Sequence, residues 1–469
     1  MIPHFAASGE NWPDGDSPVR IIMNRLPTYA LAVALALPVA GFSCKSKHTA
    51  PLPVVSPAAS SYDAMLARDW MDNAYLWVKD AGINPCDASR IYGYLGVTLW
   101  EAVANGVGQG KSLAGILQEL DAMPAPSDGL VYAWDVVANT AIAEVARAFL
   151  SAYVTEIDAI EDFHAAGSDA DPDVVARSRF YGLKVAAAII AWADADGYLD
   201  TAACEAAWTA PPVAGAWTGV GKGLRPCWGK QRTFALVNAY EREPIGTPAF
   251  STAAGSAFHA AALEVFNTTG IAGANLTPDQ LAVALYWADN PGATGTPPGH
   301  SISMTTRALA SKPAYDRLDL AAEAYARVGI AVADAFILCW RVKFETYLMR
   351  PVTYIQANVA GGAGWTSPVG TPNFPTYLSG HSTQSGAVAA VLTDIFGTMA
   401  FTDTTHSDLN PELGYTDRSF DSFFDACNEA KISRLYGGIH YPFDNQDGFD
   451  TGVNIGNLQN LRLSKVFGE

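Results

Sequence analysis

A short stretch of the chain, PTYLSGHSTQSG at residues 375–386, places a hydroxyl, a glycine and a histidine directly before an apolar, helix-prone run. Ser379 could simply be the N-cap of a helix that begins there. The arrangement also suits an anion, because a helix N-terminus offers unpaired backbone N–H groups and the positive end of the helix dipole. His381 could then exchange protons with the bound group. The stretch alone fits both interpretations, so other parts of the chain must decide.

A second stretch, WRVKFETYLMRPVTYI at residues 340–355, carries two cations. Lys343 and Arg350 are seven residues apart, which is two helical turns, so both could point from one face of a helix. Pro351 is expected to stop that helix just after Arg350. Taken alone, such a pair is typical of a solvated helix face.

A third stretch, KISRLYGGIHYPFDNQDG at residues 431–448, adds Arg434, His440 and Asp444. Asp444 could accept a hydrogen bond from one ring nitrogen of His440, which would leave the other nitrogen available as a nucleophile or metal ligand. A loop histidine beside a turn aspartate is the simpler alternative. Together the three stretches supply three cations, a hydroxyl, a helix N-terminus and two histidines. Guanidinium groups match tetrahedral oxyanions, so this set predicts a phosphate or vanadate site.

The order and spacing of these residues resemble those of one superfamily. The chain has three motifs in order: Lys–six residues–Arg-Pro, then Ser-Gly-His, then Ser-Arg–five residues–His–three residues–Asp. This pattern is similar to that of type 2 phosphatidic acid phosphatases and vanadium-dependent haloperoxidases. Leu378 departs from it, since the family usually has proline there. The resemblance implies an all-α fold of two helical bundles. It also implies that the oxyanion is held by Lys343, Arg350, Ser379, the N–H of Gly380, and Arg434.

The same resemblance implies roles for the remaining residues. His440 would be the axial vanadium ligand in a peroxidase, which would carry one vanadate per chain, or the phosphorylated nucleophile in a phosphatase, which would need no cofactor. His381 would be the acid–base residue. Asp444 would orient His440, and Lys343 would also polarise bound peroxide.

Residues outside this set favour the peroxidase. Trp340 and Phe374 match positions that line the halide pocket of fungal-type chloroperoxidases, although core packing would also explain them. The run YWADNPGATGTPPGH at 286–300 resembles bacterial haloperoxidases and places Asp289 near the pocket. The sequence therefore predicts a bacterial vanadium-dependent haloperoxidase that oxidises halide with hydrogen peroxide. The alternative is a phosphatase that acts on phosphate monoesters through a phosphohistidine. A surface lipoprotein that binds without turnover is disfavoured by the two intact histidines.

Composition limits the partners. The 469 residues are 49% hydrophobic and carry a formal charge of −18, so a nucleic-acid partner is not expected and the substrates should be small molecules.

Cys204 and Cys227 bracket a loop rich in Pro, Gly and Trp and are the favoured disulfide pair. Cys339 and Cys427 lie in apolar helical patterns and should be packed thiols. The acidic loop could hold calcium, although a solvated loop is the simpler expectation for its aspartates: Asp403, Asp408, Asp417 and Asp421.

The N-terminus has the features of an export signal. An apolar run at 29–42 follows two arginines and ends before Cys44, which would be the lipidated residue of a bacterial lipoprotein. Residues 1–44 are therefore predicted to be the signal, with Met23 as a possible true start, and 45–60 a flexible tether. The protein would be exported, as a periplasmic or outer-membrane lipoprotein or in secreted form. Its contact with a membrane would be only through Cys44.

Helical periodicity divides the rest of the chain into two parts. Residues 61–250 should form an N-terminal bundle that ends in a long irregular loop at about 201–250, which would also roof a pocket. Residues 251–469 should form a C-terminal bundle with the oxyanion site. The expected helices cover residues 61–80, 87–105, 130–151, 172–197, 253–266, 277–289, 314–347, 380–397, 421–437 and 446–464.

Overall fold

The structure is a computed structural model that describes residues 55–467. Nearly all regular structure is helical, as predicted. The α-helices are α1 (Met65–Asp80), α2 (Pro85–Val103), α3 (Trp134–Phe149), α4 (Val154–Ala166), α5 (Pro172–Asp194), α6 (Tyr198–Ala207), α7 (Ala257–Thr269), α8 (Pro278–Tyr286), α9 (Thr296–Ala310), α10 (Leu318–Thr346), α11 (Pro351–Asn358), α12 (Gly380–Phe396), α13 (Thr405–Leu409), α14 (Phe423–Tyr436) and α15 (Pro442–Leu463).

Short elements complete the fold. The 3-10 helices are η1 (Ala59–Ser61), η2 (Ala104–Gly106), η3 (Ser151–Tyr153), η4 (Trp228–Lys230), η5 (Ile271–Gly273), η6 (Pro313–Tyr315) and η7 (Pro411–Leu413). The strands β1 (Phe401–Asp403) and β2 (Arg418–Phe420) pair antiparallel. Within the described residues, no helix is both long and apolar enough to span a bilayer. The predicted signal, Cys44 and most of the predicted tether lie outside those residues.

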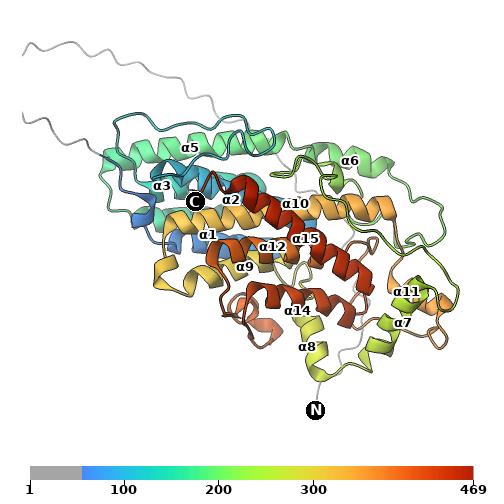
Figure 1. Cartoon of the computed structure of the whole chain (residues 1–469). Helices are drawn as coiled ribbons and strands as arrows, with labels where there is room; N and C mark the ends of the chain where they lie inside the picture. The colour runs from blue at the N-terminus through green and yellow to red at the C-terminus, as the bar shows by residue number, and fades with distance from the viewer. Residues whose placement is uncertain (1–54, 468–469) are drawn as a thin grey trace, which may run out of the picture.

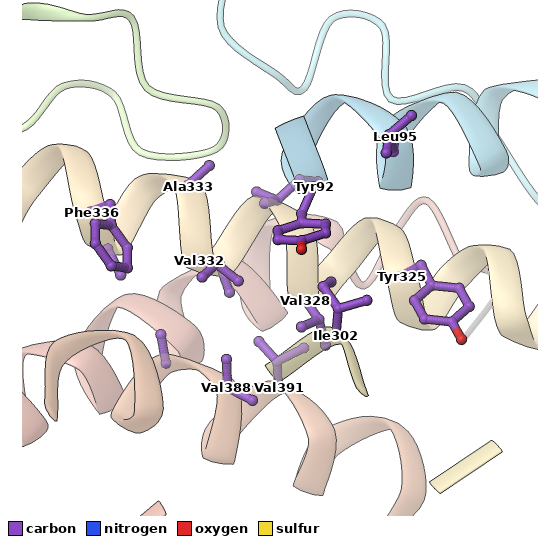
Figure 2. Close-up of a cluster of buried hydrophobic side chains, with 14 of the residues drawn as sticks. Tyr92, Leu95, Ile302, Tyr325, Val328, Val332, Ala333, Phe336, Val388 and Val391 are labelled. Atoms are coloured by element: carbon purple, nitrogen blue, oxygen red, sulfur yellow. The ribbon is translucent and has the colours of Figure 1, made fainter. Parts of the chain in front are cut away.

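The long helix α10 runs through the middle of the molecule, with α2 on one side and α12 on the other (Figure 1). Helices α3 and α5 lie beyond α2, and α14 and α15 pack against α12. The core between α2, α9, α10 and α12 is built from aliphatic and aromatic side chains, among them Tyr92, Ile302, Val332 and Val388 (Figure 2). Almost every residue of α10 is buried, so its polar side chains must find partners inside the protein.

Small residues let the central helices approach closely. A Cβ added to Gly96 of α2 would lie 2.3 Å from the carbonyl oxygen of Tyr325 on α10. A Cβ added to Gly452 of α15 would lie 1.9 Å from the carbonyl oxygen of Thr383 on α12. Both contacts are to backbone, which no side-chain rotation can relieve.

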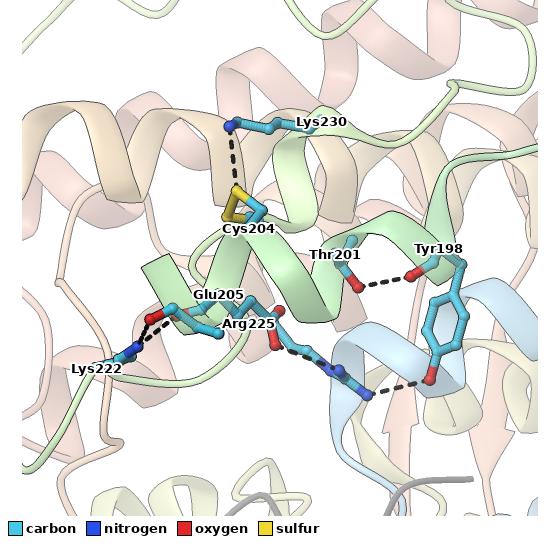
Figure 3. The surroundings of a disulfide bond; sticks show 9 residues. Tyr198, Thr201, Cys204, Glu205, Lys222, Arg225 and Lys230 are labelled. Atoms are coloured by element: carbon cyan, nitrogen blue, oxygen red, sulfur yellow. Dashed lines mark hydrogen bonds and ion pairs between the residues drawn. A yellow bond between two sulfur atoms is a disulfide. The ribbon is translucent and has the colours of Figure 1, made fainter. Parts of the chain in front are cut away.

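The segment between α6 and α7 is mostly irregular, as predicted, and is held by specific contacts. The buried Asp334 of α10 accepts hydrogen bonds from the backbone N–H groups of Phe234, Ala235 and Leu236 at 2.6, 2.9 and 2.9 Å. The predicted disulfide between Cys204 and Cys227 is present and joins α6 to the residues before η4 (Figure 3). Arg225, two residues before Cys227, pairs with Asp87 of α2. The segment is therefore fixed against both α2 and α10.

Several details of the sequence prediction are wrong. Pro351 does not stop a helix: α10 ends at Thr346, and Pro351 is the first residue of α11, where its missing N–H costs nothing. Arg350 is consequently the N-cap of α11 and does not share a helix with Lys343. Helix α9 was not predicted, because its first residues, Thr-Pro-Pro-Gly, look like a turn. Helices α4, α11 and α13 were not predicted either, and α6 overlaps the expected loop.

The acidic loop also differs from expectation. Asp403 is not solvated but fully buried in β1, whereas Asp408, Asp417 and Asp421 are exposed. Within residues 55–467, the four carboxylates do not come together as a metal-binding group. Cys339 and Cys427 are buried free thiols, as predicted.

We expect Gly452→Ala to destabilise the protein by about 1–3 kcal/mol, the usual cost of overpacking, because α15 must move away from α12. Gly364→Ala is the control, since Gly364 is exposed and an added Cβ there meets nothing within 4 Å. Urea unfolding measures the stability of both variants. Equal midpoints for the two variants would show that the helix pair tolerates a wider separation.

Candidate active site

A cavity lies where α10, the N-terminus of α12, the end of α14 and the start of α15 meet. Seven of the residues singled out in the sequence line it: Asp289, Trp340, Phe374, Gly380, His381, Arg434 and His440. The other four lie close behind this lining and are buried: Lys343, Arg350, Ser379 and Asp444. The structure thus brings three distant stretches of sequence into one site.

Helix α12 begins at the cavity, and Ser379 is its N-cap. The Ser379 hydroxyl accepts hydrogen bonds from the backbone N–H of Ser382 at 3.3 Å and from its hydroxyl at 2.9 Å. The backbone N–H of Ser379 donates to the carbonyl of Asp444 at 3.1 Å, which ties α12 to the start of α15. The Gly380 Cα faces Trp340, whose ring would be 3.3 Å from an added Cβ. The cap therefore positions the histidine that follows it.

His440 is held in one tautomer. Its Nδ1 lies 3.0 Å from Asp444 Oδ2 and 3.1 Å from Thr376 Oγ1, whereas its Nε2 lies 3.1 Å from Arg350 Nη1. Because a guanidinium can only donate, Nε2 must carry the lone pair and Nδ1 the proton. Burial, followed by the charges of Arg350 and Lys343, holds the pKa of His440 well below its usual range. His440 is thus a neutral imidazole with Nε2 as its free base.

Asp444 is fixed from several sides. Its Oδ2 also accepts hydrogen bonds from the backbone N–H of Tyr441 at 3.0 Å and, closely, from the hydroxyl of Thr376. Burial raises the pKa of Asp444, and these hydrogen bonds oppose that rise. Thr376 was missed in the sequence, because it lies in an irregular segment without a recognisable motif. Its hydroxyl contacts both members of the His440–Asp444 pair.

His381 has an equivalent arrangement on the other side of the cavity. Arg434 Nη1 donates to His381 Nε2 at 2.9 Å and also, closely, to the carbonyl of Trp287. His381 Nε2 therefore carries a lone pair as well. Burial, followed by the charge of Arg434, holds the pKa of His381 well below its usual range.

Lys343 is engaged with backbone rather than with the cavity. Its ammonium donates to the carbonyls of Pro375 and Thr376 at 3.1 and 2.9 Å and, closely, to that of Leu378. These contacts fix the segment that precedes α12. Burial lowers the pKa of Lys343. An oxyanion in the cavity would have to replace one of these carbonyls to reach the ammonium directly.

The donor set fits an oxyanion. Arg350 Nη2 and Arg434 Nε are buried without any hydrogen-bond partner. Burial lowers the pKa of Arg350 to about 9 and that of Arg434 to about 10. Unpartnered buried donors are costly, and an anion between the two guanidiniums would satisfy them.

An aromatic wall stands beside these donors. The Trp340 and Phe374 rings lie 5.0 Å apart, and Phe336 stacks on Trp340 at 5.1 Å. The Trp340 indole N–H donates to the carbonyl of Leu224 at 3.1 Å, so the long irregular segment reaches the site. Arg350 Nε donates to the carbonyl of Phe374 at 2.8 Å. The cavity is consequently polar at one end and apolar at the other.

Asp289 also faces the cavity, but its carboxylate is bound by His300, whose Nδ1 lies 2.9 Å from it. His300 Nε2 lies 2.7 Å from Asp403. His300 ends the run 286–300, but no local motif in the sequence gives it a role. The sequence does not connect His300 with Asp403, since 103 residues separate them.

The cavity combines two neutral histidines with two arginines that have unpartnered N–H groups, all near helix ends. Known proteins with similar sequences and folds show which class has such a site. The chain matches the family model of the VCPO second helical-bundle domain over residues 323–469. It is 28% identical over 222 residues to the vanadium chloroperoxidase of Curvularia inaequalis, a match that covers 36% of each chain. The shared region is therefore little more than a third of that relative's length.

Solved structures extend the likeness to most of the chain. The first bacterial vanadium-dependent iodoperoxidase is 30% identical, with a TM-score of 0.77, over 86% of this chain and 97% of that one. A holo-type bacterial vanadium-dependent chloroperoxidase is 15% identical, with a TM-score of 0.59 over 82% of this chain and 94% of that one, and so shares the fold. The chain belongs to the vanadium-dependent haloperoxidase family, bacterial branch.

The neutral state of the two histidines predicts how stability depends on pH. In the unfolded chain each takes up a proton below about pH 6.5, whereas in the folded chain their lowered pKa values keep them neutral. The free energy of unfolding should therefore fall as the pH falls below about 6.5, with each histidine contributing up to about 1.4 kcal/mol per pH unit.

Urea unfolding of the vanadate-free protein at pH 7, 6 and 5 measures this effect. His381→Gln, which cannot titrate, should reduce the slope of the free energy of unfolding against pH by the contribution of one histidine. Identical slopes for the variant and the wild type would mean that His381 is protonated in the folded protein.

Proposed function

We propose that the protein oxidises iodide or bromide with hydrogen peroxide at a vanadate bound to His440. The observation that carries this proposal is the pairing of two neutral, lone-pair-bearing imidazoles with two guanidiniums that still have unpartnered N–H groups. That pairing leaves one nitrogen for a metal, one for a proton, and spare donors for oxygens. The aromatic wall beside them adds a place for a halide.

The residues around the cavity would divide the work of holding vanadate. His440 Nε2 would be the metal ligand in place of its hydrogen bond from Arg350 Nη1, and Asp444 with Thr376 keeps the proton on Nδ1 so that Nε2 retains its lone pair. Arg350, Arg434, the N–H of Gly380 and Ser379 would hold the vanadate oxygens, and Lys343 would join them only after giving up one of its backbone carbonyls. Vanadate, when bound, supplies a Lewis acid that activates hydrogen peroxide towards halide.

His381 is the acid–base residue. Its Nε2 lone pair lies on the cavity side and can accept a proton from hydrogen peroxide, and the imidazolium so formed can return that proton to a departing oxygen. The low pKa keeps the residue in its accepting form at neutral pH. Arg434 Nη1 must give up its contact with this nitrogen while His381 carries the extra proton, and it can keep its hydrogen bond to the Trp287 carbonyl.

Trp340 and Phe374 support a halide substrate. Their rings exclude water from one end of the cavity, which favours a weakly hydrated anion such as iodide or bromide over a bulky phosphoester. The phosphatase alternative would use the same cradle. It is also disfavoured because the curated relative and the solved structures described above are haloperoxidases.

The proposal is tested by assaying the purified protein for halide oxidation with hydrogen peroxide, before and after addition of vanadate, beside hydrolysis of a phosphate monoester. We expect vanadate-dependent oxidation of iodide or bromide and weak ester hydrolysis only in the vanadate-free form, because one cradle serves both anions. Efficient ester hydrolysis without any halide oxidation after loading would establish the phosphatase instead.

Variants of the two histidines should separate binding from turnover. His440→Ala should lose tight vanadate binding and all halide oxidation, because the central atom loses its protein-derived bond. His381→Ala should still bind vanadate but turn over roughly a hundredfold or more slowly, as is usual for loss of an acid–base group. Vanadate titration and steady-state kinetics measure the two effects. The reverse pattern would exchange the roles of the histidines.

Substitution of the aromatic wall should change halide preference. Phe374→His introduces a polar ring beside the oxyanion donors and should alter the ratio of bromide to iodide oxidation more than it alters vanadate affinity. Phe344→His is the matched control, since Phe344 lies on α10 but outside the cavity lining. If the halide ratio were unchanged in Phe374→His, the halide would have to approach from another side.

A further inference from the structure

His300 on α9 is a buried histidine outside the set that holds the oxyanion. It is 1% exposed, and each of its ring nitrogens faces a carboxylate: Nδ1 lies 2.9 Å from Asp289 and Nε2 lies 2.7 Å from Asp403. A neutral imidazole has only one N–H, so two carboxylate acceptors require the imidazolium. Burial opposes this charge, but the two aspartates outweigh it and raise the pKa of His300 to about 10.

The imidazolium contacts the irregular segment 287–289, part of which lines the cavity, at two points. The Trp287 ring stacks on the His300 ring, with centroids 4.4 Å apart and planes inclined by 20°. Two residues later, Asp289 is bound through its carboxylate and has a left-handed backbone with φ of 48°. A non-glycine residue keeps that conformation only when its surroundings enforce it. His300 therefore contacts both ends of the segment 287–289.

The other partner of His300 is itself immobilised. Asp403 Oδ1 accepts hydrogen bonds from the backbone N–H and the hydroxyl of Thr405 at 3.0 and 2.6 Å. The same hydroxyl lies 2.8 Å from Ser303 Oγ on α9. Asp403 thus anchors His300 from the ring nitrogen opposite the one that faces Asp289.

The segment 287–289 contacts Arg434, one of the oxyanion donors. Arg434 Nη1 donates to the Trp287 carbonyl, whereas Arg434 Nε has no hydrogen-bond partner. Asp289 lines the same cavity as Arg434, and its negative charge raises the pKa of Arg434 against the larger lowering by burial. A freed Asp289 carboxylate would therefore compete with an oxyanion for Arg434.

We propose that His300 is a positioning residue of the oxyanion site, which holds Trp287 and Asp289 so that Arg434 keeps a free donor for the bound anion. The role is indirect, since His300 does not line the cavity. This inference rests on the proposed function, because it concerns the affinity of the same site for vanadate.

A metal ion is the competing explanation for this cluster. Asp289, His300 and His406 could each offer one ligand atom to a common ion. Both His300 nitrogens are already used by carboxylates, however, and His406 Nε2 lies 2.8 Å from the carbonyl of Tyr286. A cation would have to displace these partners, so the closed ion-pair network is favoured.

The test is the dissociation constant of vanadate, measured by equilibrium dialysis against the purified vanadate-free protein. His300→Gln carries no charge and can serve only one carboxylate well, so Asp289 is released, and we expect affinity to fall at least tenfold. The double variant His300→Gln/Asp289→Asn removes the competing carboxylate and should recover most of the loss. A purely structural role would predict additive damage instead of rescue.

His259→Gln is the matched control. His259 is also buried and hydrogen-bonded, through Nδ1 to the Tyr354 hydroxyl at 3.2 Å, but it takes no part in the oxyanion site. Its vanadate affinity should equal that of the wild type. If His300→Gln does not fold, Asp403→Asn provides the test: it keeps the cation, removes the fixed anchor and should weaken binding severalfold.

Each outcome is decisive. A folded His300→Gln or Asp403→Asn protein with wild-type affinity overturns the inference, and so does a double variant that binds no better than the single one. A stoichiometric divalent metal in the wild-type protein, whose removal weakens vanadate binding as His300→Gln does, would replace it with the metal site. Absence of vanadate binding by the wild type would instead refute the proposed function.

Discussion

The burial of three cations with too few anions around them is the constraint on which this structure depends. Lys343, Arg350 and Arg434 are each at most 1% exposed, and Asp444 is the carboxylate that lies within the cradle, already bound to His440. Charges removed from water need partners, and an incomplete set is destabilising. Carbonyl oxygens satisfy Lys343, but both arginines keep unpartnered N–H groups. An anion in the cavity would supply the missing partner.

The fold makes this arrangement possible by placing the functional groups at helix ends. Arg350 is the N-cap of α11, Ser379 is the N-cap of α12, and Asp444 lies in the first turn of α15. A helix end fixes the backbone on one side and leaves polar groups available on the other. Close contact of α12 with α15 then brings His381 and His440 to opposite sides of one cavity. The long, buried α10 supplies the apolar wall and carries Lys343.

The sequence predicted the parts of this site that have local motifs. The spacing around Lys343, His381 and His440 singled out residues that meet at one cavity, and helical periodicity located most of the central helices. It could not identify Thr376 or Leu224, because their contacts depend on irregular segments that have no periodic pattern. Arg350 was predicted to be on the wrong helix, since a proline can begin a helix as readily as end one.

Long-range pairs were equally inaccessible to the sequence. His300 and Asp403 are far apart in the chain, and each taken alone has an ordinary interpretation, one as a residue after a turn and the other as part of an acidic loop. Only the packing of α9 against β1 joins them. The loop was therefore expected to be solvated, although its first aspartate completes a buried ion-pair network beside the oxyanion site.

The central claim is that one anion completes the cationic cradle, and calorimetric titration tests it most directly. Vanadate added to the vanadate-free protein should bind at one site per chain, and phosphate should compete fully for that site. A second independent site, or simultaneous binding of both anions, would contradict the account. So would a lack of heat with either anion, because the two arginines would then have found another partner.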